Sequence, residues 1–226
     1  MTPGPRDVLL VIDVQGDFLP GGALAVPDGE AVIAPVNRLL KAFPHAVLTQ
    51  DWHPPGHVSF AASHPGREPF DTVPLAYGPQ LLWPQHCVQG SAGAAFAPGL
   101  DAPRAELVIR KGHNPALDSY SAFLEADRRT PTGLAGYLRE RGFTRVVLCG
   151  LATDYCVAWS ALDARAAGFE ALVVEDAVRG IDLDGSVARA WAEMAAAGVE
   201  RITSGAIAPI PRSHTDRTHP RARSSP

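Results

Sequence analysis

RVVLCGLATDYC, residues 145–156, joins the end of a buried strand to the start of a helix. Residues 145–149 are almost continuously apolar, which predicts a strand buried on both faces, and residues 150–155 form a short turn. An apolar repeat at Val157, Ala158, Ala161 and Leu162 then begins a helix. Strands of this kind, followed by helices, are typical of an α/β fold with a parallel sheet.

The same alternation continues along the chain. Strands are predicted at residues 8–13, 46–49, 107–110, 146–149, 171–174 and, more weakly, 200–203. Helices are predicted at about 29–42, 132–141, 154–167 and 184–197. This pattern predicts a doubly wound, Rossmann-like α/β fold, with a six-stranded, mainly parallel sheet and helices on both faces.

Length and composition limit the classes of protein that remain. The chain has 226 residues, 46% of them hydrophobic and 19% charged, as in an ordinary globular protein. A net charge of -4, without a Lys/Arg stripe, argues against a nucleic-acid partner. No apolar run is long enough to span a membrane, and residues 1–6 do not form a signal peptide. Three cysteines without CxxC spacing favour a reducing compartment, so we expect a cytoplasmic protein.

The chain is expected to form one domain over residues 1–208. Within it, residues 51–105 are rich in Pro, Gly, His and Trp and are far too long for a simple connection, which indicates a functional insertion at the active site. Residues 209–226 lack a core-forming pattern and are predicted to be a disordered tail.

Cys156 lies where the predicted helix begins. In the first helical turn, free backbone N–H groups and the helix dipole favour a thiolate and could hold a developing oxyanion. Both features suit a nucleophilic cysteine. The alternative is a small, buried core residue, which is the usual role of a free cysteine.

Polar residues follow four of the predicted strands. Asp13 ends the first, Asp51 and His53 follow the second, Lys111 follows the third, and Cys156 follows the fourth. Ligands of open parallel sheets bind at the carboxyl ends of the strands, so these residues are expected at one site. Asp13 would act as general base for the thiol, and Lys111 would compensate its charge. The alternatives are a helix or turn cap for Asp13 and a solvated surface position for Lys111.

A metal site is predicted from the segment Asp51-Trp52-His53. In extended chain, residues i and i+2 point the same way, so a carboxylate and an imidazole can meet one ion. His86 would complete a two-histidine, one-carboxylate set suited to Zn²⁺, Fe²⁺ or Mn²⁺. His57 is expected in a supporting or fourth-ligand role. Each histidine could instead be an ordinary loop or core residue.

Three aromatic residues flank these polar positions in the sequence: Phe18, Trp83 and Tyr120. Individually each could be a core residue, but together they could sandwich a small flat ring, because apolar walls with a few polar groups form small-molecule sites.

On these residues the chain resembles the nicotinamidase/pyrazinamidase branch of the isochorismatase-like cysteine hydrolases. The resemblance covers about residues 7–205 and rests on the segments 13–18 (DVQGDF), 21–24 (GGAL), 50–54 (QDWHP), 57–60 (HVSF), 82–90 (LWPQHCVQG), 111–112 (KG), 118–123 (DSYSAF) and 150–157 (GLATDYCV).

The resemblance implies roles for individual residues. The implied catalytic residues are Asp13, Lys111 and Cys156, and the implied metal ligands are Asp51, His53 and His86. Ala152 and Cys156 would form the oxyanion hole, next to a cis peptide at Leu151–Ala152. The implied substrate-binding residues are Phe18, Leu24, Trp83, Tyr120 and Tyr155. Gln85 departs from the family, which usually has Asp there, and could alter the tuning of His86.

The implied activity is metal-dependent deamidation of nicotinamide to nicotinate and ammonia, and of pyrazinamide to pyrazinoate, in NAD salvage through a Cys156 thioester. One divalent ion is expected, zinc before iron or manganese. The expected partner is the small-molecule substrate, with a homo-oligomer left open. Two alternatives remain: a metal-independent amide or carbamoyl hydrolase of the same superfamily, and a catalytically silent binding module in which Cys156 is unreactive.

Overall fold

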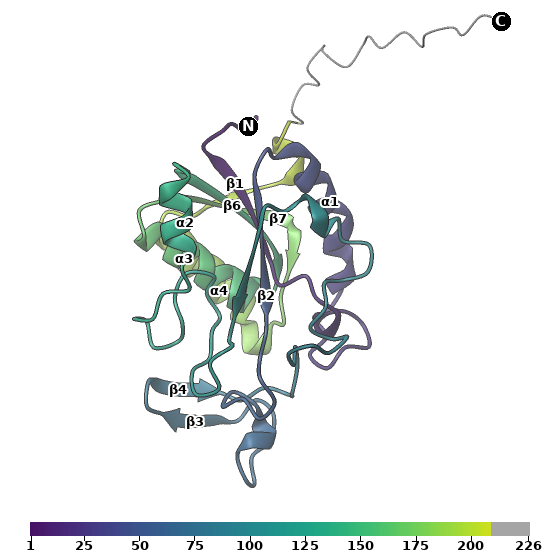
Figure 1. Ribbon diagram of the computed structural model, residues 1–226, viewed down its shortest axis with the longest axis vertical. Coiled ribbons are helices and arrows are strands. Elements are labelled where there is room, and N and C mark those ends of the chain that lie inside the picture. Colours follow the sequence, from purple (N-terminus) through teal and green to yellow (C-terminus); the bar gives the residue numbers. More distant parts are fainter. Residues whose placement is uncertain (209–226) are drawn as a thin grey trace, which may run out of the picture.

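The computed structural model describes residues 1–208, so the predicted tail at 209–226 lies outside the described residues. Six strands form one sheet in the order β5-β2-β1-β6-β7-β8 (Figure 1). The paired neighbours are all parallel, which confirms the doubly wound fold. The strands are β1 (Asp7–Ile12), β2 (Ala46–Asp51), β5 (Leu107–Lys111), β6 (Arg145–Leu151), β7 (Glu170–Arg179) and β8 (Glu200–Ile202).

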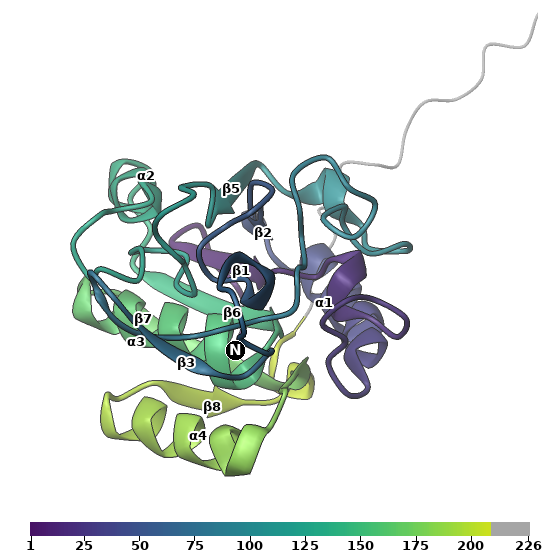
Figure 2. The same ribbon diagram turned by 90° about the horizontal axis from the view of Figure 1, so that it is seen from below.

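Helices cover both faces of the sheet (Figure 2). One face packs against α1 (Ile33–Ala42), and the other packs against α2 (Leu134–Glu140), α3 (Ala158–Ala166) and α4 (Ser186–Ala196). Successive residues of β1 pack into the two hydrophobic cores on opposite faces of the sheet. Leu9 packs on the α1 side and Leu10 on the α2–α4 side. Because both faces are covered, β1 is continuously apolar from Val8 to Ile12 instead of alternating.

Short helical turns complete the secondary structure. The 3₁₀ turns are Gly16–Phe18, Gly29–Val32, Ala61–Ser63, Ala102–Arg104, Leu183–Gly185 and Ser204–Ala206, and Thr153–Val157 is a π-helix. The predicted helix at 154–167 is therefore a π turn that continues into α3. Such π turns are frequent at functional sites.

The insertion at 51–105 contains a hairpin that the sequence did not predict. Strands β3 (Thr72–Leu75) and β4 (Gly78–Leu81) pair antiparallel and form a separate two-stranded sheet. Figure 1 shows the hairpin below the carboxyl ends of the central strands. The insertion therefore lies on the side of the sheet where the predicted site residues meet.

The two edge strands are less buried than the central strands. In β5 the residues before Lys111 alternate between partly buried and exposed, and Val108 is 42% exposed. In β8, at the other edge, Glu200 and Arg201 are exposed. An edge strand has one open side, which explains this difference. Among the helices of residues 1–208, none is long and apolar enough to cross a membrane.

Candidate active site

The four predicted strand ends do meet. Asp51 and Lys111 are register partners at the ends of β2 and β5, Asp13 follows β1, and Cys156 lies in the π turn after β6. The central strands are adjacent in the sheet order, so their carboxyl ends deliver these side chains to one place.

Lys111 connects the group. Its ammonium Nζ lies 2.8 Å from Asp13 Oδ2, 2.9 Å from Asp51 Oδ1 and 3.4 Å from Cys156 Sγ. It also donates to the Ser119 carbonyl at 3.0 Å. The side chains of Lys111 and Asp13 are fully buried. Burial alone would lower the pKa of Lys111, but Asp13 and Asp51 raise it well above its usual value, so the lysine is charged.

The carboxylate of Asp13 is held in place as a hydrogen-bond acceptor by Thr49. Thr49 Oγ1 donates to Asp13 Oδ1 at 2.6 Å, and Thr49 Oγ1 in turn accepts from the Asp13 amide at 3.1 Å. Burial raises the pKa of Asp13 while Lys111 opposes that rise. A carboxylate with a raised pKa is a better base than an ordinary aspartate, which suits the predicted role.

The surroundings of Cys156 act on its thiol in opposite directions. Burial raises the pKa of the thiol well above the usual value; Lys111 lowers it, whereas Asp13 and Asp51 raise it further. Burial therefore opposes the thiolate that the helix terminus and Lys111 favour. Lys111 Nζ lies 3.4 Å from Cys156 Sγ and 2.8 Å from Asp13 Oδ2, so the sulfur and the carboxylate contact the same ammonium. The thiol proton has to leave during the attack, and Asp13 is the nearby carboxylate that can accept it.

The three predicted metal ligands converge beside this group. Asp51 Oδ2 lies 3.0 Å from His53 Nε2 and 3.2 Å from His86 Nε2, and one ligand atom from each residue fits within 4.8 Å of the others. All three residues are buried. Burial alone would raise the pKa of Asp51, but His53 and Lys111 lower it well below its usual range.

The hydrogen bonds around the histidines fix which nitrogen faces the cluster. His53 Nδ1 lies 3.0 Å from the Gly112 carbonyl, and His86 Nδ1 lies 2.7 Å from the Pro84 carbonyl. A carbonyl only accepts, so both Nδ1 atoms carry the hydrogen. In the neutral rings Nε2 is then a bare acceptor, as in most metal-bound histidines.

These residues fit a divalent cation. With both rings neutral, two bare Nε2 atoms and Asp51 Oδ2 would face one another as three acceptors, and a positive charge between them removes the conflict. The pKa of His53 points the same way: burial lowers it, yet Asp51 raises it above the usual value, so the cluster attracts positive charge. Nitrogen and carboxylate donors of this kind suit zinc, iron or manganese.

His57 lies beside the cluster, with its ring 4.3 Å from that of His53. Its Nδ1 is 2.7 Å from Ser59 Oγ, and its Nε2 lies near the carbonyls of Asn114 at 2.9 Å and Leu117 at 3.2 Å. Both ring nitrogens are therefore engaged with protein groups. This geometry favours the supporting role over that of a fourth ligand.

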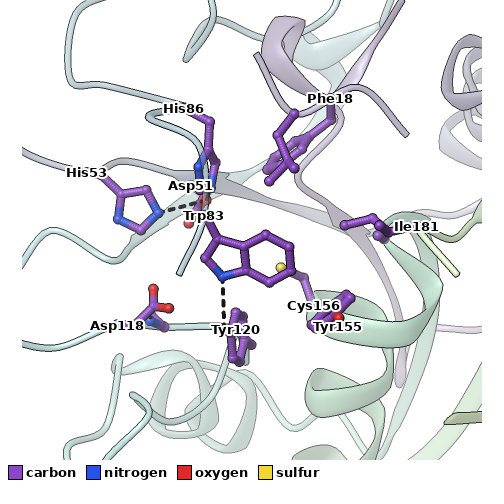
Figure 3. Close-up of a pocket in the computed structure, with 13 residues that line it drawn as sticks. Phe18, Asp51, His53, Trp83, His86, Asp118, Tyr120, Tyr155, Cys156 and Ile181 are labelled. Carbon is purple, nitrogen blue, oxygen red and sulfur yellow. Dashed lines mark hydrogen bonds and ion pairs between the residues drawn. The ribbon is translucent and has the colours of Figure 1, made fainter. Parts of the chain in front are cut away.

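A cavity opens next to Cys156 and the metal cluster. All five predicted substrate-binding residues line it, together with Ala152. Figure 3 shows the Trp83 ring in front of Cys156, with Phe18 above it and Tyr120 below it. The aromatic side chains of the cavity wall contact one another: the centroids of the Trp83 and Tyr155 rings are 4.8 Å apart, and the ring planes meet at 87°.

Three further residues line the cavity that the sequence analysis did not single out: Asp118, Ser119 and Ile181. Asp118 is a buried carboxylate that accepts from the Ser119 amide at 2.8 Å and from Gln80 Nε2 at 2.7 Å. Asp118 lies in a loop, whereas the sequence-based search considered only polar residues at the carboxyl ends of strands. Its only signal was its place in the family-like segment 118–123.

Two details of the resemblance can be checked. The peptide bond between Leu151 and Ala152 is cis, as expected. Gln85 is exposed and makes no hydrogen bond among the described residues, whereas Pro84 supplies the carbonyl that orients His86. Gln85 therefore has no hydrogen bond through which it could tune His86.

The comparisons with known proteins agree with this geometry. The Isochorismatase domain family matches residues 7–206. A nicotinamidase of Acinetobacter baylyi is 56% identical over 196 residues, covering 87% of this chain and 92% of its own.

Two solved structures are similar over nearly their whole length. A nicotinamidase/pyrazinamidase of Acinetobacter baumanii has a TM-score of 0.89 at 55% identity and covers 90% of this chain and 98% of its own. A pyrazinamidase of Pyrococcus horikoshii, solved in complex with zinc, has a TM-score of 0.72 at 37% identity and covers 88% and 99%. The chain therefore belongs to the isochorismatase family, on its nicotinamidase and pyrazinamidase branch.

Proposed function

We propose that this protein hydrolyses nicotinamide to nicotinate and ammonia, and pyrazinamide to pyrazinoate, and that it serves NAD salvage. The observation that carries the proposal is the contact of one buried ammonium, Lys111 Nζ, with Asp13, Asp51 and Cys156 beside a cavity walled by aromatic rings. The nicotinamidase at 56% identity supports the same activity.

Acylation would begin with the thiol of Cys156. As Sγ forms a bond to the carboxamide carbon, the thiol proton passes to Asp13 and the carbonyl electron pair moves onto oxygen. The Ala152 and Cys156 N–H groups would stabilise that oxygen. Asp13 then returns the proton to the nitrogen, the C–N bond breaks, and ammonia leaves a thioester on Cys156.

Deacylation would use the same base. Asp13 takes a proton from water, the water oxygen attacks the thioester carbon, and the C–S bond breaks. Asp13 returns its proton to the leaving sulfur, and the acid product loses a proton to solvent as nicotinate is released. Lys111 stays charged throughout and balances the carboxylates on either side of it.

Asp51, His53 and His86 would hold one divalent ion, and we propose zinc, with iron or manganese as the other ions that suit these ligands. When bound, the ion would supply an electrophilic anchor for the pyridine nitrogen, directly or through water, so that the ring is oriented for attack. The pyrazinamidase solved with zinc supports this choice of metal.

The setting of the enzyme is part of the proposal. Three free cysteines support a reducing, cytoplasmic compartment. We further propose that residues 1–208 act as one domain, with the 51–105 insertion at the active site. A homo-oligomer is compatible with this arrangement, and the small-molecule substrate is the partner that the cavity suits.

Cys156→Ala tests the division of labour between sulfur and metal. This variant should release no ammonia from nicotinamide, yet it should bind nicotinamide and retain metal like the wild type. Ammonia release by the variant would refute the thioester route. Loss of metal from a folded Cys156→Ala protein would refute the separation of the two sites.

A further inference from the structure

Gln15 is a fully buried glutamine in the turn after β1, two residues beyond Asp13. Its side-chain amide holds both main-chain groups of Asp51: Nε2 donates to the Asp51 carbonyl at 2.8 Å, and Oε1 accepts from the Asp51 amide at 2.7 Å. Nε2 also donates to the Ala94 carbonyl at 2.8 Å. Reversing the side-chain amide would set its oxygen against two carbonyls, so its orientation is fixed.

These hydrogen bonds continue the sheet where its main-chain pairing ends. β1 pairs with β2 only as far as Val11 and Leu48, whereas β2 runs on to Asp51. Asp13 has a φ of +45°, in the left-handed region, so the chain of β1 turns away there. Asp51 is only 3% exposed, and buried main-chain groups need partners. The Gln15 side chain therefore takes the place of a β1 peptide beside Asp51.

The position of Asp51 matters because its two carboxylate oxygens have different partners. Oδ1 lies 2.9 Å from Lys111 Nζ, while Oδ2 lies 3.0 Å from His53 Nε2 and 3.2 Å from His86 Nε2. A displacement of the Asp51 main chain would move both oxygens at once. Because metal–ligand distances tolerate only about 0.2 Å, such a displacement would weaken a metal site at these residues.

A second buried amide shows what Gln15 does that a merely structural glutamine does not. Gln50 Nε2 donates to the same Ala94 carbonyl at 2.9 Å, but Gln50 Oε1 accepts from Arg110 Nε at 3.1 Å. Among the hydrogen bonds of residues 1–208, the Gln50 side chain makes none to Asp51. The two amides thus share one acceptor, and only the amide of Gln15 holds the metal ligand.

We propose that Gln15 is a positioning residue for the metal site. It fixes the main chain of Asp51 so that Oδ2 stays with the two histidine ligands and Oδ1 stays on Lys111. Since Gln15 and Asp13 belong to one turn, the same contact also sets the general base at a fixed place relative to the metal ligands. This inference rests on the metal ligands assigned under the proposed function.

The test is Gln15→Met, with two readouts that do not need activity. Methionine keeps the length of glutamine but has neither the N–H groups nor the oxygen. Competition with a chelator should show a zinc Kd raised about tenfold, the lower end of the usual effect of removing a group that orients a metal ligand. The visible spectrum of the cobalt(II)-loaded variant should also differ from that of the wild type, because the displaced carboxylate changes the ligand field.

Gln50→Met is the matched control, because it removes the other bond to the Ala94 carbonyl and leaves Asp51 held. Its zinc Kd and cobalt spectrum should equal those of the wild type, even where its unfolding midpoint falls. If Gln15→Met does not fold, Gln15→Asn serves instead. Its amide is one methylene shorter and cannot reach both groups of Asp51, so it should raise the zinc Kd in the same way.

Two results would overturn the inference. One is an unchanged zinc Kd and cobalt spectrum in a folded Gln15 variant. The other is an equal rise of the zinc Kd in Gln50→Met, which would mean that general loosening of this region and not the hold on Asp51 weakens the site. A wild type that binds no divalent ion would refute the metal assignment, and this inference with it. A wild type that binds zinc but releases no ammonia would refute the proposed activity alone, and the zinc Kd values would still decide the role of Gln15.

Discussion

Replacing Gly112 with alanine should weaken metal binding while leaving the fold in place. Gly112 has a φ of +67°, and a Cβ there would lie 2.5 Å from His53 Cε1 and 2.7 Å from His53 Nδ1. Ordinary contacts begin at 3.4 Å, so the His53 ring would have to retreat by close to 1 Å. Metal–ligand distances tolerate only about 0.2 Å.

The expected effect of Gly112→Ala has two parts, a loss of stability and a loss of metal affinity. An alanine in the left-handed region costs about 1–2 kcal/mol of stability. Disturbing the partner of a metal-bound histidine typically lowers metal affinity about 10- to 100-fold, and here the Gly112 carbonyl is the partner of His53 Nδ1. Gly112→Ala should therefore lose both stability and zinc affinity.

Gly142→Ala separates these two effects. Gly142 has a φ of +74° and nothing within 4 Å of the added Cβ, so it carries the backbone cost alone. Urea unfolding should show a backbone-related loss of stability in both variants. Competition with a chelator should show weaker zinc binding only in Gly112→Ala. Equal zinc affinity in the two variants would refute the assignment of His53 as a ligand.

Other predictions concern the remaining buried groups. Asp13→Asn should stop ammonia release yet move the pH midpoint of Cys156 alkylation downward, because Asp13 raises the pKa of that thiol; an upward move would contradict the electrostatics. Glu125→Gln should raise the free energy of unfolding by about 1 kcal/mol at alkaline pH, since Glu125 Oε2 is buried and has no hydrogen-bond partner among residues 1–208. The gain should shrink at acid pH, because burial raises the pKa of Glu125 above 4.5 and its ionisation therefore destabilises the fold as pH rises. A pH-independent difference would refute this. His57→Gln should lower the unfolding midpoint but retain stoichiometric metal, and loss of the metal would make His57 a ligand.

The fold could be predicted well because its signals are local. All six predicted strands form in one parallel sheet, and the polar residues that end or follow four of them meet at the carboxyl ends of the strands, as expected. Asp51 and His53 needed only their i, i+2 spacing to be recognised as neighbours on one side of an extended chain.

The remaining features depend on long-range contacts. The hairpin β3–β4 has four residues per strand, with Pro74 opposite Pro79, and gives no clear alternating pattern. Asp118 and Gln80 meet only because the insertion folds back over a loop far along the chain. The helix terminus beside Cys156 is visible in the sequence, whereas the burial of its sulfur near two carboxylates, which raises the pKa of the thiol, depends on the fold.

The most direct test measures ammonia release from nicotinamide by the purified protein, before and after chelation, with metal analysis of the same sample. The account predicts one divalent ion per chain, steady ammonia release, loss of activity when the metal is removed, and recovery when zinc is restored. Full activity in a metal-free sample, or no ammonia from a metal-loaded one, would contradict it.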